Sequence, residues 1–182
     1  MNVAPQLSDR TRVHGRVHAR EVLIAPLSGR RCVAHRCWGR VAGQRFDESE
    51  ALPFELTLTG GRRARIDERS RLEVAFHEGD GDLRFRSALF HPWAMPLFGR
   101  VLRSGCLPER LAAFLRARGI EAPGAGAIYE LALEPGCGAL VEARVDEPRT
   151  RGYRDARPVL MLRETEAGDP VIIRGRDAPP GT

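Results

Sequence analysis

The sequence contains no lysine, so all 29 of its basic residues are arginines. This absence excludes Schiff-base catalysis, a lysine clamp on phosphate groups and a side-chain acceptor for ubiquitin. The net charge is +5, and acidic residues are interspersed along the whole chain. We therefore interpret most arginines as members of a solvated surface of mixed charge.

Long apolar runs are also missing. A helix that spans a membrane needs about 18 or more consecutive apolar residues, whereas the stretch 88–102 is shorter and is broken by His91, Pro92 and Pro96. Residues 1–12 lack the apolar core of a signal peptide. We expect a cytoplasmic protein, or one peripheral to a membrane, with its four cysteines as free thiols.

The chain has enough apolar residues for one sizeable core, since 42% of its 182 residues are hydrophobic. We predict a single domain over 13–176, with flexible tails at 1–12 and 177–182. The 19 glycines and 13 prolines favour many turns and short strands over long helices.

Alternation with a period of two residues predicts most of the strands. The clearest hairpin joins 53–58 to 63–67 through Gly60 and Gly61. The acidic segment 46–53 is predicted as a loop. The other expected strands lie within 13–24, 32–38, 72–76, 128–133, 140–145, 159–162 and 171–173.

One helix is predicted, over 108–118. Pro108 suits its first turn, Gly119 suits its end, and Leu111, Phe114 and Leu115 form an apolar stripe. The expected fold is β-rich, of the α+β class: a small, partly open β-barrel or sandwich with this one helix packed on it.

Three blocks of the sequence have a recognisable order. Within 17–33 the chain reads strand, then P-L-S-G-R-R-C-V, then strand; 53–67 reads as a hairpin, and 108–145 as a helix followed by L-E-P-G and a strand. These blocks resemble the GIDE domain, also called the BAM or "beside a membrane" domain, and the resemblance covers about 13–173.

The resemblance implies a β-rich interaction module of the stand-alone bacterial type, with no catalytic residues to transfer. The chain lacks the transmembrane helices of most relatives and the paired C-x-x-C knuckles of those with a RING finger. Cys137 stands where the family has an aspartate after Pro-Gly. Ubiquitin-ligase activity is therefore not implied.

Cys32, His35 and Cys37 are the weak candidates for a metal site, because they have the side chains that bind zinc. On a regular strand residues 32 and 37 would point to opposite faces, which argues against shared coordination. We predict no metal and no cofactor, and interpret Cys32 as a buried apolar residue. An enzyme using one of the thiols remains a lesser alternative.

Two segments are candidates for binding. A basic hairpin carries Arg62, Arg63 and Arg65, which makes an arginine-driven nucleic-acid-binding barrel the main alternative function, although few aromatic residues accompany these arginines. An apolar loop with two prolines either docks a partner or folds back onto the core. Its residues are Trp93, Met95, Leu97, Phe98, Arg100 and Arg103.

We therefore expect a non-catalytic protein-interaction or scaffold module rather than an enzyme. Its partner would be an unidentified protein, with peripheral contact to an anionic membrane as a further expectation and nucleic acid as the less favoured partner.

Flotation with liposomes tests the membrane expectation. The wild-type chain should float with vesicles that contain anionic lipid, and a Trp93→Ala/Phe98→Ala variant should not, because the two rings would supply the apolar anchor. Neutral vesicles are the control for the contribution of charge. If the wild type floats with neither vesicle, this segment does not contact membranes.

Overall fold

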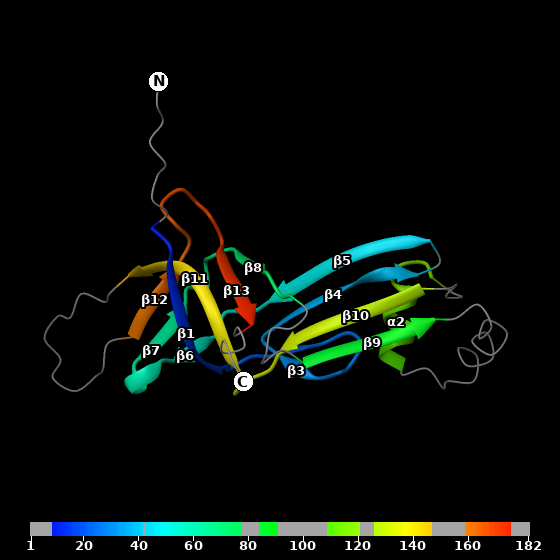
Figure 1. Cartoon of the computed structure of the whole chain (residues 1–182), viewed down its shortest axis with the longest axis horizontal. Helices are drawn as coiled ribbons and strands as arrows, with labels where there is room; N and C mark the ends of the chain where they lie inside the picture. The colour runs from blue at the N-terminus through cyan, green and yellow to red at the C-terminus, as the bar shows by residue number, and fades with distance from the viewer. Residues whose placement is uncertain are drawn as a thin grey trace, which may run out of the picture.

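The computed structural model describes residues 9–41, 43–77, 84–90, 109–120, 126–146 and 159–175, and only the backbone of 84–90 and 109–111. These residues form a β-barrel beside a four-stranded antiparallel sheet, with one short helix (Figure 1). The predicted β-rich fold with a barrel and a packed helix is confirmed. In the part of the chain described, no helix is long and apolar enough to cross a membrane.

Five strands close the barrel in the order β1, β6, β7, β12, β11 and back to β1. All neighbours are antiparallel except β7 and β12, which are parallel. The barrel is therefore closed, whereas the sequence led us to expect a partly open one. The strands are β1 (Thr11–His18), β6 (Glu55–Thr57), β7 (Arg63–Ile66), β12 (Val159–Arg163) and β11 (Gly138–Asp146).

Closure depends on β1, because this strand pairs with β11 along most of its length and with β6 at its end. Gly15 lies in the tight part of the strand, where a Cβ would approach the Leu56 Cβ and the Thr57 carbonyl oxygen to 2.9 Å. Val13 and Val17 point into the core. β1 begins at Thr11 rather than at the predicted Val13.

The predicted hairpin is confirmed: β6 and β7 are antiparallel and are joined by a 3-10 turn, η1 (Thr59–Gly61), in which Gly60 has a φ of 79°. Two further strands extend the sheet beyond β11. β13 (Val171–Gly175) pairs antiparallel with β11, and β8 (Leu72–Val74) pairs parallel with β13. β8 also lies against β5 and β4 of the other sheet.

The second sheet has the order β5, β4, β10, β9, with all neighbours antiparallel. Its strands are β5 (Gln44–Ala51), β4 (Ala34–Val41), β10 (Gly126–Leu133) and β9 (Arg84–Phe90). A short pair, β2 (Leu23–Ile24) with β3 (Arg31–Cys32), precedes β4 in the chain.

The helix α2 (Glu109–Arg116) covers one face of the second sheet. Phe114 and Leu115 pack in a cluster with Cys37 and Ile128 of that face. The helix ends at Arg116 rather than at the predicted residue 118, because the N–H of Ile120 donates to the Leu115 carbonyl (3.0 Å) and that of Gly119 to the Arg116 carbonyl (2.9 Å). This Schellman pattern, with Gly119 at φ 71°, ends the helix, as expected from a glycine at this position.

Two local predictions were wrong. The segment 46–53, predicted as a loop, is mostly the strand β5, which pairs with β4 along its whole length. Six of the eight residues of β5 are exposed, so the alternation that identifies a half-buried strand is absent. The predicted strand 32–38 is interrupted at Val33, where the chain passes from β3 to β4.

Two glycines allow β4 and β10 to approach closely. A Cβ on Gly39 would lie 2.2 Å from the Ala127 carbonyl oxygen, and one on Gly126 would lie 2.0 Å from the Arg40 carbonyl oxygen. Both distances fall far below a van der Waals contact with backbone atoms that cannot move independently of the sheet. Neither position therefore accepts a side chain without separation of the strands.

We predict that Gly39→Ala lowers the free energy of unfolding by about 2 kcal/mol or more, because the added methyl group forces β4 away from β10. Urea unfolding followed by circular dichroism measures the change. Ser49→Ala, at an exposed position of β5, is the matched control and should change stability by about 0.5 kcal/mol or less. Equal midpoints for the two variants would contradict the close approach.

Candidate functional site

The face of the second sheet that points away from α2 carries a stacked aromatic pair. Trp38 of β4 and Tyr129 of β10 are cross-strand partners. Their ring centroids are 5.6 Å apart and their planes differ by 27°. Both side chains are half-buried, so the pair offers apolar and polar ring atoms on a rigid sheet.

Arg36 holds one side of this pair. Its guanidinium donates two hydrogen bonds to Asp47, at 2.9 and 2.7 Å, and a third to the Phe76 carbonyl at 2.9 Å. The guanidinium carbon lies 5.4 Å from the centroid of the Trp38 ring. The hydrogen bonds from Arg36 hold the pKa of Asp47 below its usual value, and they raise that of Arg36. Arg36 is therefore a fixed part of the face.

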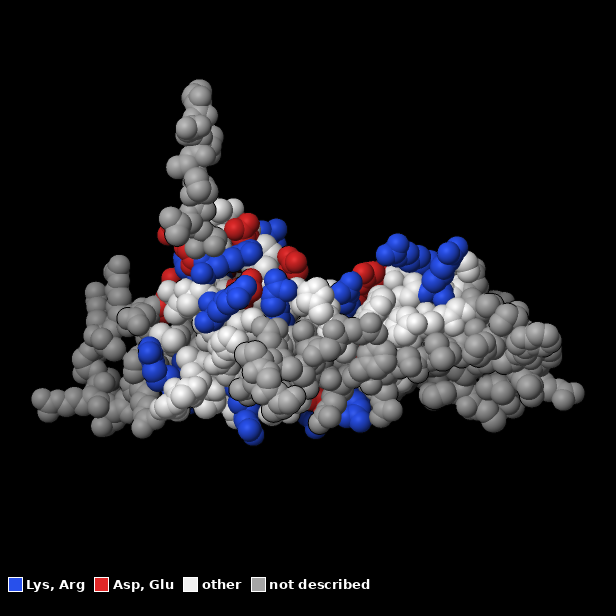
Figure 2. Space-filling view, in the orientation of Figure 1, with Lys and Arg blue, Asp and Glu red and all other residues white. Residues whose placement is uncertain are grey.

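Arg40 and Arg45 lie on the other side of the pair. They are cross-strand partners at the end of the β4–β5 hairpin, both are exposed, and neither forms an ion pair within the described part of the chain. Two like charges directly opposite one another destabilise a strand pair. Figure 2 shows arginine side chains gathered over this end of the sheet.

A cavity of about 350 Å³ joins the two features. It is lined by Trp38, Gly39, Arg40, Arg45, Phe46, Asp47 and Tyr129. We call the set Arg36, Trp38, Arg40, Arg45, Asp47 and Tyr129 the aromatic–arginine face. The sequence analysis missed it, because its members come from three strands and one of these, β5, was predicted as a loop.

The opposite face of the sheet holds a buried carboxylate. Glu130 is fully buried and accepts hydrogen bonds from the backbone N–H groups of Leu27 (2.5 Å) and Ser28 (3.2 Å). These donors belong to the turn that carries the P-L-S-G sequence. The only signal for this role in the sequence is an acidic residue inside the apolar run 128–133. Its two backbone donors make Glu130 a structural anchor of that turn.

Cys32 and Cys37 lie near the same carboxylate. Cys32 packs with Ala132, and Cys37 is the cross-strand partner of Glu130, so both thiols neighbour one face of β10. On one regular strand the two side chains would point to opposite faces, but Cys32 and Cys37 belong to different strands, because the chain is interrupted at Val33. Burial, followed by the charge of Glu130, raises the pKa of each thiol to about 12.

His35 is buried as well, with its Nε2 3.6 Å from a carboxylate oxygen of Glu50 and its Nδ1 without a hydrogen-bond partner among the described residues. Burial lowers the pKa of His35, which favours the neutral imidazole. Within the described ranges, no three histidine, cysteine or acidic side chains are grouped as metal ligands would be.

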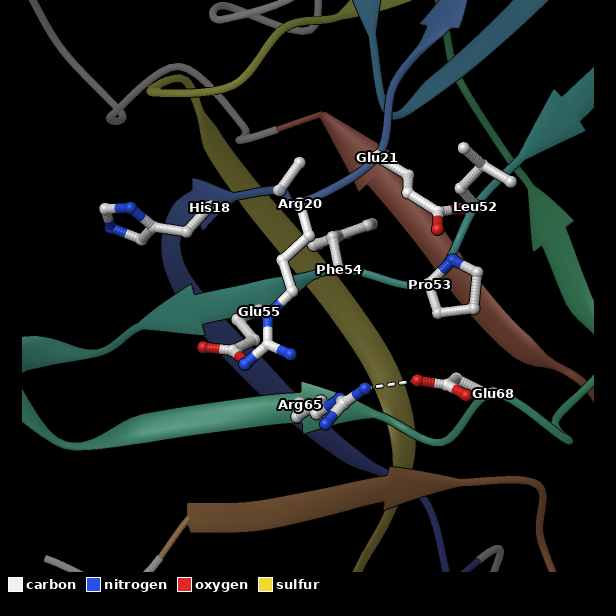
Figure 3. Close-up of a pocket in the computed structure, with 10 residues that line it drawn as sticks. His18, Arg20, Glu21, Leu52, Pro53, Phe54, Glu55, Arg65 and Glu68 are labelled. Carbon is white, nitrogen blue, oxygen red and sulfur yellow. Dashed lines mark hydrogen bonds and ion pairs between the residues drawn. The ribbon is translucent and has the colours of Figure 1, made fainter.

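The basic hairpin lies on the barrel, beside a cavity of about 490 Å³ lined by side chains of both signs (Figure 3). Arg65 pairs with Glu68, and Arg63 lies 4.0 Å from Glu55, which also pairs with Arg20 at 3.8 Å. Carboxylates thus offset the charge that the sequence alone assigned to this hairpin. Arg62 makes further interactions of its own.

The apolar loop candidates lie outside the described residues, namely Trp93, Met95, Leu97, Phe98, Arg100 and Arg103. No family model, curated protein or solved structure matches the chain. The resemblance to the GIDE domain therefore stays a prediction from the sequence.

Alkylation tests the state of the two buried thiols. Cys32 and Cys37 should resist iodoacetamide at pH 7 in the folded protein, because a thiol with a pKa of about 12 is almost fully protonated there. Mass spectrometry of the digested protein reports each cysteine separately, and the protein unfolded in urea is the positive control. Rapid reaction of either thiol with a midpoint below about pH 8 would show an activated thiolate and contradict the structure.

Proposed function

We propose that this chain is a non-catalytic interaction module that recognises a partner protein through the aromatic–arginine face. The observation that carries the proposal is the placement of two exposed arginines, Arg40 and Arg45, beside the stacked Trp38 and Tyr129; neither arginine forms an ion pair with the described residues. Tryptophan, tyrosine and arginine are the residues most enriched where protein interfaces gain their binding energy.

The burial of the thiols supports a non-catalytic role. A cysteine nucleophile acts as the thiolate, and it is activated by a lowered pKa or an adjacent base. For Cys32 and Cys37 burial and Glu130 act in the opposite direction. These two residues are therefore unsuited to nucleophilic catalysis at neutral pH.

The rigidity of the face also supports recognition. Arg36 is held by three hydrogen bonds, and Trp38 packs against the barrel core. A surface that is already ordered loses little side-chain entropy on binding.

We further propose that the module works in the cytoplasm, with the segment 90–103 as a contact to anionic membranes.

Nucleic acid is the second candidate partner. The same observation favours it, since aromatic rings beside arginines also form the platforms on which single-stranded bases stack. In this respect the aromatic–arginine face is a better candidate than the basic hairpin, whose arginines are offset by carboxylates.

Affinity capture with matched variants separates these proposals. The baits are the wild-type chain, the face variant Arg40→Gln/Arg45→Gln, and a control Arg62→Gln/Arg63→Gln that removes the same charge from the barrel. We expect one protein to co-purify from nuclease-treated lysate with the wild type and the control. The face variant should lose it, because its two cations are missing.

The isolated partner should then bind the face variant at least about tenfold more weakly than the wild type in calorimetry. Equal retention by the face variant would place binding elsewhere on the chain. Loss of capture after nuclease treatment would instead favour the nucleic-acid alternative.

A further inference from the structure

The cationic end of the aromatic–arginine face has a defined geometry. Arg40 lies two residues beyond Trp38 on β4, so the two side chains share a face and are separated by about 7 Å along the strand. Arg45 is opposite Arg40, and Ala127 of β10 is the partner on the other side. A row of two arginines and a small residue therefore borders the row that holds Asp47, Trp38 and Tyr129.

Arg40 and Arg45 are suited to binding an anion. Each guanidinium presents donors in a fork that matches a carboxylate, and neither has an acidic partner among the described residues. Asp47 is the nearest acidic residue of the face, but it already accepts two hydrogen bonds from Arg36. A bound anion would also relieve the repulsion between Arg40 and Arg45.

The row that holds Trp38 and Tyr129 is suited to contact with a planar apolar group. The cavity of about 350 Å³ is lined by both arginines and by both rings, so it lies where the two kinds of side chain meet. An aromatic side chain placed here would contact the edge of the ring pair and a guanidinium plane, both of which are favourable neighbours.

Two observations favour a protein segment over a nucleic acid. Proteins bind a nucleic-acid strand along a groove with many cations, whereas the described part of the face has two arginines without ion pairs. Arg36 and Tyr129 both neighbour the Trp38 ring, which leaves less of it for a base.

We propose that the face binds a short acidic segment of a partner protein in which an aromatic side chain is flanked by carboxylates. The carboxylates pair with Arg40 and Arg45, and the aromatic ring lies in the cavity between these arginines and the Trp38–Tyr129 pair. This inference rests on the proposed interaction function and names the chemistry of the partner.

Fluorescence anisotropy tests it with defined probes. The first is a fluorescein-labelled peptide with one tryptophan flanked by glutamates. The second has glutamine in place of glutamate, and the third has alanine in place of tryptophan. The fourth is an oligodeoxythymidine with the same net charge as the first. Each probe is titrated with the wild type, with Arg40→Gln/Arg45→Gln and with the control Arg62→Gln/Arg63→Gln.

We expect the acidic tryptophan peptide to bind the wild type and the control equally, and to bind the face variant at least about tenfold more weakly. The glutamine and alanine peptides should each lose about tenfold or more on the wild type. Thermal unfolding confirms that the variants are folded, which is expected because all four substituted residues are exposed.

Three results would overturn the inference. Equal loss of binding in both arginine variants would indicate general attraction to a basic protein. Binding of the oligonucleotide alone, with loss in the face variant, would keep the face as an interaction surface but replace the partner class. If no probe binds, the partner chemistry is wrong, and the capture experiment still decides the interaction function separately.

Discussion

The buried carboxylate of Glu130 holds together the connection between the two halves of the fold. The chain leaves the barrel at the end of β1 and enters the second sheet at β4, and the turn around Leu27 and Ser28 lies on this path. The buried carboxylate of Glu130 accepts hydrogen bonds from the backbone N–H groups of that turn. An ion pair between Arg30 and Glu134, at 2.7 Å, joins the same two segments. A buried carboxylate is tolerated here because hydrogen bonds replace its hydration.

Attachment of the sheet to the barrel explains where the recognition surface lies. Ala34, Leu131 and Leu133 belong to the same core as the barrel strands, so one end of the sheet is buried against the barrel. Trp38 packs on the edge of this core. At the far end of the face, around the β4–β5 hairpin, Arg40 and Arg45 are exposed. The position of the aromatic–arginine face is therefore a consequence of how the two sheets share one core.

Pairing rather than number decides which arginines matter. Arg63 and Arg65 belong to a basic run in the sequence, but carboxylates of the barrel offset their charge. Arg40 and Arg45 are five positions apart and belong to no run, yet the hairpin places them opposite each other, and neither forms an ion pair with the described residues. Net charge thus gives no guide to the site, because carboxylates offset some arginines locally and leave others, such as Arg40 and Arg45, without an ion pair among the described residues.

The local sequence pattern determined the β-rich class, the hairpin of β6 and β7, the strands β10 to β13, and the helix α2 with its end at Gly119. Each of these depends on the periodicity or the turn chemistry of neighbouring residues. The tertiary structure alone decided the closure of the barrel by β1, the strand β5, the break at Val33 and the role of Glu130. Each of these depends on a partner that is distant in the sequence. The aromatic–arginine face belongs to this second group: Trp38 and Tyr129 meet only because β4 pairs with β10, and no local pattern encodes that pairing.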